Sequence, residues 1–215
     1  NVVVSLDFSQ IELRVASTLS RDGILLSAFR ENRDLHSETA ELILREVYKK
    51  DRKDVDDKEF KEVWRAKAKG VNFGIIYGLS SESFVSMFDN ISRDKAIEIY
   101  NLIKNRYKGF YEWGEEEFQK VMKRGYVETP FGRIRRFDFN DISNTELFRL
   151  TVNTIVQSVA SDLTLYCAIK IYEKYKNFWG LIHDSIVLEI PGDYKGILEF
   201  CDFLDSNIPK YIEES

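Results

Sequence analysis

The sequence predicts an α+β fold in which a small antiparallel sheet carries a large helical insertion. Three observations support this prediction. An apolar, β-branched segment opens the chain at residues 2–8, and a pair of short apolar segments meets at a tight turn within 178–190. Helical patterns fill most of the sequence between them. The first segment and the last pair are therefore expected to share one sheet.

The remaining elements follow from periodicity and turn residues. The helix expected at 60–78 ends near Gly78, a good C-terminal stop, and 143–175 is expected as one helix or as a helix with a single break. Thr129-Pro130-Phe131-Gly132 marks a turn between short extended pieces, and residues 51–59 are charged and expected to be exposed. In order, the expected helices occupy residues 10–30, 34–48, 60–78, 81–90, 93–107, 110–124, 143–175 and about 195–206.

The composition excludes several classes of protein. Hydrophobic residues make up 44% of the 215 residues, which excludes a wholly disordered chain. No apolar run approaches the roughly 20 residues of a membrane helix, and we expect no membrane partner. Residues 2–4 read as a strand rather than as part of a signal peptide. Cys167 and Cys201 form neither a disulfide framework nor a zinc pattern, so we expect a reducing, cytoplasmic location.

The net charge of −5 conceals an uneven distribution. Residues 61–70 carry +3 and residues 120–136 carry +5, which leaves −13 on the rest of the chain. Cationic patches on an acidic body suit a ligand with phosphates. Solvated helix faces are the alternative.

Two aspartates stand at strand ends. Asp7 ends the first strand, and His183-Asp184 lies at the turn between the last two. If these strands are neighbours, the two carboxylates can hold metal ions that activate a hydroxyl group and stabilise a leaving oxygen. Each also has a plain alternative, because Asp7 can cap the following helix and charged turn residues are common.

One helix face combines cations with aromatic rings. Arg65, Lys69, Phe73 and Tyr77 recur at steps of four and span about 120° of one face. Such a face can grip phosphates at one end and stack a base at the other. An amphipathic helix with snorkelling cations is the alternative.

A second polar series follows the helix expected at 143–175. Arg149, Asn153 and Gln157 also recur at steps of four, in an otherwise apolar pattern. Their side chains can hydrogen-bond groove edges and sugars of a nucleic acid. A solvent-facing helix edge is the alternative.

Together these motifs closely resemble family A DNA polymerases, the bacterial DNA polymerase I type. The segment from Asp7 to Arg14 is similar to the first palm motif, and Ile182-His183-Asp184 is similar to the last. Arg65-x3-Lys69-x3-Phe73-Gly74-x2-Tyr77-Gly78 is similar to the fingers-helix motif. Three further segments also resemble the family, at residues 34–40, at 129–133 and at 149–157.

The resemblance implies a function and roles for residues. It implies a DNA-directed DNA polymerase that transfers deoxynucleotides to a primer 3′-OH and releases pyrophosphate. Asp7 and Asp184 would be catalytic and bind two Mg²⁺ ions together with the Phe8 carbonyl group. The implied nucleotide-binding residues are Gln10, Glu12, His36, Arg65, Lys69, Phe73 and Tyr77. The implied DNA-binding residues are Arg149, Asn153, Gln157 and His183.

The resemblance also implies an organisation and partners. The fold would be the polymerase right hand without its thumb: a first palm motif at 1–20, helical fingers at 21–135 and a C-terminal palm at 136–215. The partners would be primer–template DNA, deoxynucleoside triphosphates and an N-terminal thumb and exonuclease segment or companion chain.

Ser185 departs from the family pattern, because it stands where a Glu is usual. That difference keeps two other interpretations open, a single-subunit RNA polymerase relative and a non-catalytic DNA-binding remnant. Glu12 and the Phe73-Gly74-x2-Tyr77-Gly78 pattern favour the DNA enzyme.

Overall fold

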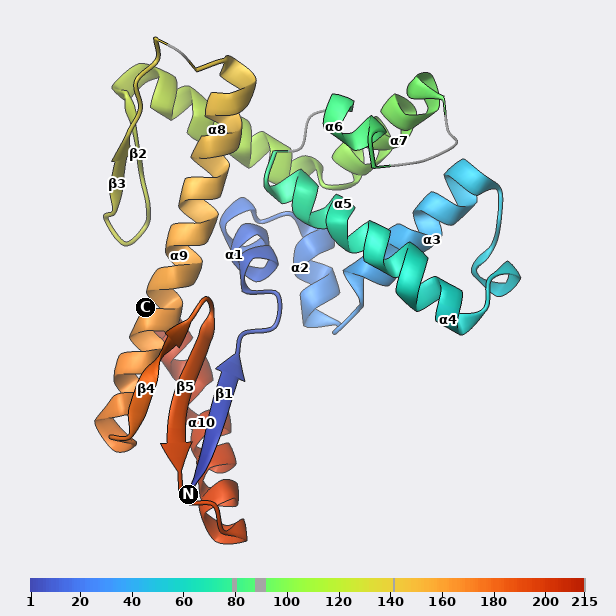
Figure 1. Ribbon diagram of the computed structural model, residues 1–215. Coiled ribbons are helices and arrows are strands. Elements are labelled where there is room, and N and C mark those ends of the chain that lie inside the picture. Colours follow the sequence, from blue (N-terminus) through green and yellow to red (C-terminus); the bar gives the residue numbers. More distant parts are fainter. Residues whose placement is uncertain (79–80, 88–91, 141, 215) are drawn as a thin grey trace. The chain divides into compact units, whose positions relative to one another are not determined.

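The computed structural model describes residues 1–78, 81–87, 92–140 and 142–214, and the chain divides into two compact units (Figure 1). Unit 1 comprises residues 1–12, 129–133 and 157–215, and unit 2 comprises residues 13–128 and 134–156. Each unit therefore draws on segments that are far apart in the sequence. None of the described helices combines the length and the apolar composition that a membrane span requires.

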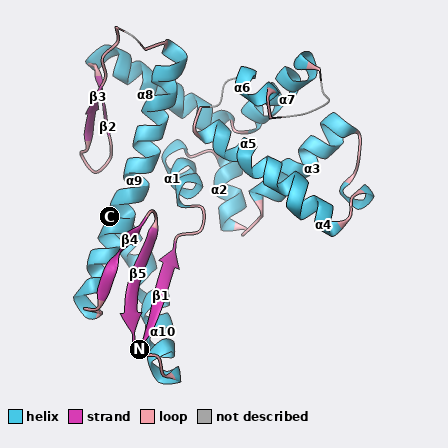
Figure 2. Cartoon of the chain, viewed as in Figure 1, coloured by secondary structure: helices cyan, strands magenta, loops and turns pink. Residues whose placement is uncertain are grey.

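Unit 1 contains a three-stranded antiparallel sheet (Figure 2). Its strands are β1 (Val2–Asp7), β4 (Phe178–Ile182) and β5 (Ser185–Ile190), in the order β1-β5-β4. The register sets Val2 opposite Ile190 and Asp7 opposite Ser185. This order confirms the expected sheet of the first segment and the last two. The apolar β5 is the central strand, and one strand pairs with it on each side.

The core of unit 1 lies between this sheet and two helices. The helices are the C-terminal part of α9 (Asn144–Lys174) and α10 (Tyr194–Glu214). Alternate residues of β5 are buried, which is the period-2 pattern of a strand with one face on a core. The buried side chains of this cluster are Cys167, Ala168, Ile171, Ile186, Leu188, Ile190, Phe200 and Phe203.

Unit 2 is largely helical and also contains the short hairpin of β2 and β3, which confirms the expected turn. Its core is rich in large side chains that are fully buried, among them Leu13, Leu44, Phe84 and Phe110. Its elements are α1 (Ile11–Ser20), α2 (Gly23–Arg30), α3 (Leu35–Tyr48), η1 (Arg52–Asp54), α4 (Asp57–Glu59), η2 (Phe60–Arg65), α5 (Ala66–Ile76), α6 (Ser81–Val85), α7 (Arg93–Arg106), α8 (Lys108–Arg124), β2 (Tyr126–Glu128) and β3 (Ile134–Arg136).

The expectation of one helix over residues 10–30 is wrong. Arg21 has a positive φ of 52°, which ends α1, and Asp22 caps α2 by accepting hydrogen bonds from the backbone N–H groups of Ile24 and Leu25. Asp22 is buried and its other carboxylate oxygen accepts from the Phe110 N–H at the start of α8. One carboxylate therefore serves two helices, which explains why the chain turns here despite its apolar pattern.

Three other helices differ in detail from the expectation. The helix expected at 60–78 begins with the π-helical turn η2 and continues as α5, with a left-handed Gly78 (φ 69°) just beyond it. The helix α10 extends to Glu214 rather than to about 206, whereas α9 is continuous, which is one of its two expected forms. Residues 88–90 of the helix expected at 81–90 lie outside the described residues, and α6 covers only Ser81–Val85.

Candidate functional site

The strand register of unit 1 brings the two predicted carboxylates to one end of the sheet. Asp7 is the last residue of β1 and lies opposite Ser185, the first residue of β5. Asp184 directly precedes Ser185 in the turn that follows Ile182. The Ser185 hydroxyl group donates a hydrogen bond of 3.2 Å to Asp7 Oδ1. The two aspartates predicted to bind metal thus lie at the same end of neighbouring strands, as expected from the sequence.

The donors at this sheet end fit Mg²⁺. Asp7 is exposed and Asp184 is partly exposed, so both carboxylates keep oxygen atoms accessible to a ligand. Mg²⁺ prefers oxygen ligands and uses one or two carboxylates together with substrate phosphates. Within the part of the chain that the structure describes, no group of three or more His, Cys, Asp or Glu residues forms an all-protein metal cage. A site of two carboxylates is the arrangement that Mg²⁺ shares with a phosphate substrate.

His183 occupies the turn beside Asp184. It is exposed and has a positive φ of 57°, which is uncommon for a residue with a side chain. The two-residue turn places the exposed imidazole next to the carboxylate pair in sequence. His183 is therefore available for an external ligand.

The segment after β1 contributes the other predicted residues of unit 1. Phe8 packs against the core of this unit, which anchors the backbone immediately after Asp7. Gln10 has a positive φ of 56°, and its Oε1 atom is buried without a hydrogen-bond partner among the described residues. Glu12 is partly buried at the start of α1. The Phe8 carbonyl group lies next to Asp7 in the backbone, where a second oxygen ligand is expected.

The predicted cation–aromatic face of unit 2 lies on η2 and α5. The Lys69 Nζ atom lies 5.8 Å from the centroid of the Phe73 ring, within the range of a cation–π contact. The rings of Phe73 and Tyr77 stack at 6.1 Å with an interplanar angle of 16°. Tyr77 continues the helical hydrogen bonding one residue beyond α5, since its N–H donates to the Phe73 carbonyl group. Steps of four therefore do place these side chains together.

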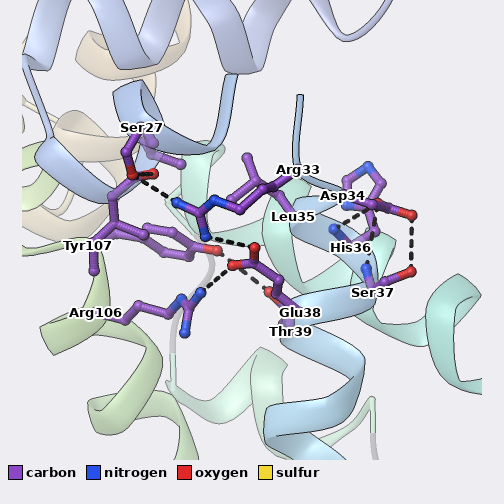
Figure 3. A network of polar contacts seen from close by, with 12 residues as sticks. Ser27, Arg33, Asp34, Leu35, His36, Ser37, Glu38, Thr39, Arg106 and Tyr107 are labelled. Carbon is purple, nitrogen blue, oxygen red and sulfur yellow. Dashed lines mark hydrogen bonds and ion pairs between the residues drawn. The ribbon is translucent and has the colours of Figure 1, made fainter. Parts of the chain in front are cut away.

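Arg65, the first member of that face, is bound to a carboxylate. Its Nε atom donates to Asp34 Oδ2 at 2.7 Å, and the two side chains are 37% and 41% exposed. Asp34 also caps α3 by accepting from the N–H groups of His36 and Ser37 (Figure 3). Partial burial acts to raise the pKa of Asp34, but the hydrogen bonds from Arg65 and Ser37 outweigh it and lower the pKa to about 2. The guanidinium group of Arg65, which is predicted to bind phosphates, thus already has an anionic partner.

His36 lies in the first turn of α3, beside this ion pair. Its ring is 5.9 Å from the Phe73 ring, and only 2% of the residue is exposed. Its Nδ1 atom is 3.0 Å from Asn72 Nδ2, whereas Nε2 is buried and has no hydrogen-bond partner among the described residues. Burial lowers the pKa of His36, and the charges of Arg65 and Lys69 lower it further, against the opposite effect of Asp34. The ring is therefore a neutral donor or acceptor near the cations.

The helix that carries His36 is held in place by a three-residue ion network. Glu38 accepts hydrogen bonds from Arg33 at 2.6 Å and from Arg106 of α7 at 2.5 Å (Figure 3). Arg33 also donates to the Ser27 hydroxyl group at 2.7 Å, which joins α2 to α3. Because these groups are only partly exposed, water competes with them less than at an open surface. The network fixes α3 between its neighbours and hence fixes the position of His36.

The polar series on α9 is distributed over both units. Arg149 forms an ion pair with Glu146 one turn earlier, and Asn153 Oδ1 is buried without a partner among the described residues. Gln157 is exposed and belongs to unit 1. The three side chains follow one continuous helix, as their spacing predicts.

Two contributors to the site were not predicted as site residues. Asn72 lies beside Phe73 in the fingers motif and contacts His36, and Asp34 binds Arg65. The position of Asp34 before a helix predicts an N-cap. Nothing in that pattern predicts its second contact, with Arg65. Asn72 carries one useful signal, a polar side chain among the apolar residues of α5.

Comparison with known proteins identifies the family. Residues 1–200 match the family model described as DNA polymerase family A. The chain is 34% identical over 209 residues to DNA polymerase I of Caldicellulosiruptor bescii, covering 93% of this chain and 23% of that protein. It is 33% identical over 205 residues to the thermostable DNA polymerase I of Thermus aquaticus, covering 88% of this chain and 23% of that protein. The chain thus spans less than a quarter of the length of these relatives.

A solved structure supports the same assignment. The POL domain of Pol1 from M. smegmatis, in complex with DNA primer-template and dNTP, superposes with a TM-score of 0.74 and 25% sequence identity. The alignment covers 92% of this chain and 35% of that one. Agreement between the family match, the relatives and the fold leads to one conclusion: the chain belongs to the family A DNA polymerases.

Proposed function

We propose that this chain carries the nucleotidyl-transfer centre of a template-directed DNA polymerase, in which a primer 3′-OH attacks the α-phosphate of a deoxynucleotide and pyrophosphate leaves. The observation that carries the proposal is the register of unit 1, which sets Asp7 opposite Ser185 and next to Asp184 at one sheet end. Phosphoryl transfer depends on positioning and on charge neutralisation rather than on covalent catalysis. Carboxylates on rigid strands meet the first requirement.

Asp7, Asp184 and the Phe8 carbonyl group would hold two Mg²⁺ ions. When bound, such ions activate the attacking oxygen and stabilise the leaving oxygen. Asp7 contributes a carboxylate whose position is set by the β1–β5 pairing and by the hydrogen bond from Ser185. Asp184 contributes a second carboxylate from the adjoining turn.

Unit 2 supplies the side chains for the incoming nucleotide. Arg65, Lys69 and His36 bind the triphosphate, and the phosphates displace Asp34 from Arg65. Phe73 packs against the sugar and base, and Tyr77, stacked on Phe73, lies on the template-base side. Unit 1 contributes two further residues: Glu12 excludes a ribose 2′-OH, and Gln10 contacts the nucleotide.

The remaining predicted residues bind DNA. Arg149, Asn153, Gln157 and His183 contact primer and template near the new base pair. Support comes from the M. smegmatis POL domain, whose solved structure contains primer-template and dNTP. The subdomain boundaries at 20 and 135, and a partner segment that carries a thumb and an exonuclease, remain part of this proposal.

One observation favours a second candidate. Ser185 leaves the metal site with two carboxylates, and its hydroxyl group binds Asp7 directly. A single-subunit RNA polymerase relative, or a DNA-binding remnant without turnover, would share this feature. Ribonucleotide incorporation identifies the first, and template binding without any extension identifies the second.

The decisive experiment is primer extension by the chain, supplied with the N-terminal segment of a relative, in Mg²⁺ with either deoxynucleotides or ribonucleotides. Extension with deoxynucleotides is expected, and Asp184→Asn should abolish it while primer–template binding stays close to that of the unaltered chain. The matched control is Asp193→Asn, in unit 1 but outside the sheet end, which should retain extension. Turnover by Asp184→Asn would remove the metal role of that residue.

A further inference from the structure

A buried polar cluster lies beneath His36 and is not explained by ligand binding alone. Asn72 of α5 is 2% exposed, Thr39 of α3 is fully buried and Tyr107 is 3% exposed. Buried polar groups cost free energy unless they are hydrogen-bonded. The direction of each hydrogen bond in this cluster can be worked out from the chemistry of its partners.

The orientation of the Asn72 amide is set by a carbonyl group. Asn72 Nδ2 lies 3.2 Å from the Leu35 backbone oxygen, which can only accept a hydrogen bond. On the other side, Asn72 Oδ1 accepts from Thr39 Oγ1 at 2.9 Å and from the Tyr107 hydroxyl group at 3.5 Å. The reversed amide would set an oxygen against the Leu35 oxygen. The NH₂ group therefore faces Leu35.

The second hydrogen of this NH₂ group points to His36. Asn72 Nδ2 is 3.0 Å from His36 Nδ1. Because Nδ2 donates, Nδ1 must accept, and an accepting Nδ1 carries no proton. A neutral imidazole without a proton on Nδ1 carries its proton on Nε2.

That Nε2–H group is buried and has no partner among the described residues. An unsatisfied buried donor is unfavourable, because the group has lost its hydrogen bonds to water without gaining another. The charged groups around the ring are Asp34, Arg65 and Lys69. Two of the three are cations, so the vicinity of this donor favours an anionic ligand.

We propose that Asn72 is a positioning residue that holds His36 in its neutral Nε2–H tautomer, so that the ring presents an N–H donor to an anionic oxygen. Asn72 itself touches no ligand, and the Leu35 carbonyl group fixes the orientation of its amide. The tautomer follows from the contacts alone. The identity of the anion, a phosphate oxygen of the incoming nucleotide, rests on the proposed function.

The tautomer can be measured directly, because the chain has only two histidines. Proton–nitrogen correlation spectra of the nitrogen-labelled chain distinguish protonated from unprotonated ring nitrogens, and His183→Gln assigns the remaining signals to His36. At neutral pH, His36 is expected to show a protonated Nε2 and an unprotonated Nδ1. A protonated Nδ1 would overturn the proposal without any variant at position 72.

Asn72→Asp replaces the donor with an acceptor of the same shape. The proton should then move to Nδ1, and the pKa of His36 should rise because a carboxylate stabilises the imidazolium ion. Thr39→Val is the matched control, since it removes a hydroxyl group from the same buried cluster but leaves the Leu35 carbonyl group that orients Asn72. Thr39→Val should keep the wild-type tautomer. An unchanged tautomer in Asn72→Asp, or the same change in both variants, would overturn the proposal.

Inorganic tripolyphosphate separates this proposal from the proposed function. In the wild type, added tripolyphosphate should shift the His36 Nε2–H signal. The affinity of Asn72→Asp for tripolyphosphate, divided by that of the wild type, should fall as the pH rises. At high pH the ring of the variant is neutral and carries its proton on Nδ1, so Nε2 no longer donates. A constant affinity ratio in a variant whose tautomer has changed would overturn the role of the donor. An Nε2–H tautomer whose signal does not respond to tripolyphosphate would contradict the phosphate-binding function while leaving the assignment of Asn72 intact.

Discussion

At the scale of single residues, the Asp34–Arg65 ion pair connects acid stability with the proposed nucleotide binding. The pKa of Asp34 is about 2, below its ordinary value of 3.8, because Arg65 and Ser37 stabilise the carboxylate in the folded chain. A lowered pKa contributes stability that is present above the ordinary value and is lost as the pH falls through the folded value. This contribution should therefore disappear between about pH 4 and pH 2.

Asp34→Asn tests this directly. The amide can still cap α3 but cannot titrate, so the free energy of unfolding should fall less between pH 4 and pH 2 than it does in the wild type. Urea unfolding followed by circular dichroism measures the difference. Asp56→Asn, at the N-cap of α4, is the control and should leave most of the acid dependence in place. Asp34→Asn should also bind tripolyphosphate several-fold more tightly, since Arg65 loses its internal anion; weaker binding would contradict that competition.

Ser185 offers a test of the metal site in unit 1. Ser185→Glu adds a third carboxylate directly opposite Asp7 in the register. Because affinity for divalent cations increases with the number of charged ligands, Mn²⁺ should bind about tenfold more tightly, or about 1.4 kcal/mol. Electron paramagnetic resonance of free Mn²⁺ measures the change. Ser5→Glu, farther from the end of β1, should gain much less, and equal gains would argue against a site at the sheet end.

At the scale of elements, the glycines of the fingers motif differ in what they tolerate. Among the described residues, a Cβ atom at Gly70 would meet only Met87 Cε at 3.0 Å, the tip of a flexible side chain. Gly70→Ala should therefore stabilise the chain by about 0.5–1 kcal/mol, because alanine is the better helix former in α5. Chemical unfolding measures this gain.

Gly78→Ala is the contrasting substitution. Gly78 has a φ of 69°, and an added Cβ atom would lie 3.0 Å from the Arg149 Cα atom in α9. Backbone strain and this clash should together destabilise the chain by about 2 kcal/mol. If Gly70→Ala and Gly78→Ala had the same effect, the close approach of α5 and α9 at this point would be wrong.

Local patterns predicted the elements but not where tertiary contacts end them. The apolar strands and the helix face with a spacing of four residues can be predicted from the sequence. The placement of Asp7 and Asp184 at one end of the sheet can be predicted as well. The break at Arg21 was not, because it depends on a buried carboxylate that also caps a helix 88 residues later. Likewise, Asn72 is predictable as a polar residue in an apolar helix, but its contact with His36 comes from the packing of α3 against α5 and not from any local pattern.

At the scale of the whole molecule, several cationic residues have internal anionic partners. Arg65, Arg133 and Arg149 pair with Asp34, Asp162 and Glu146, respectively. The acidic total of −5 is thus compatible with cationic patches, because carboxylates pair with some of the cations. Under the proposed function, a nucleic acid would bind by exchange, with its phosphates replacing these carboxylates.

Asp162→Asn tests this exchange in unit 1. Arg133 binds Asp162 through two nitrogens, with Nε 2.8 Å from Oδ1, and the substitution leaves the Arg133 charge without its counter-charge. Duplex DNA should bind more tightly, and the slope of log affinity against log salt should steepen by up to about one. Fluorescence anisotropy across a KCl series measures both.

The control for this experiment is Glu199→Gln, which removes an exposed carboxylate paired with Lys195 at 3.7 Å. It changes the net charge by the same amount but should barely affect the slope. Equal slopes in the two variants would show that only total charge matters.

The order of the strands also has a consequence for biosynthesis. The central strand β5 is made last of the three, so β1 leaves the ribosome some 180 residues before its partner. The hydrogen bond between Ser185 and Asp7, for example, joins residues that are 178 positions apart. Closing so long a loop is slow compared with forming local helices. During translation β1 waits for β5 while the helices of unit 2 can already form. The carboxylate pair is therefore assembled only after β5 has emerged.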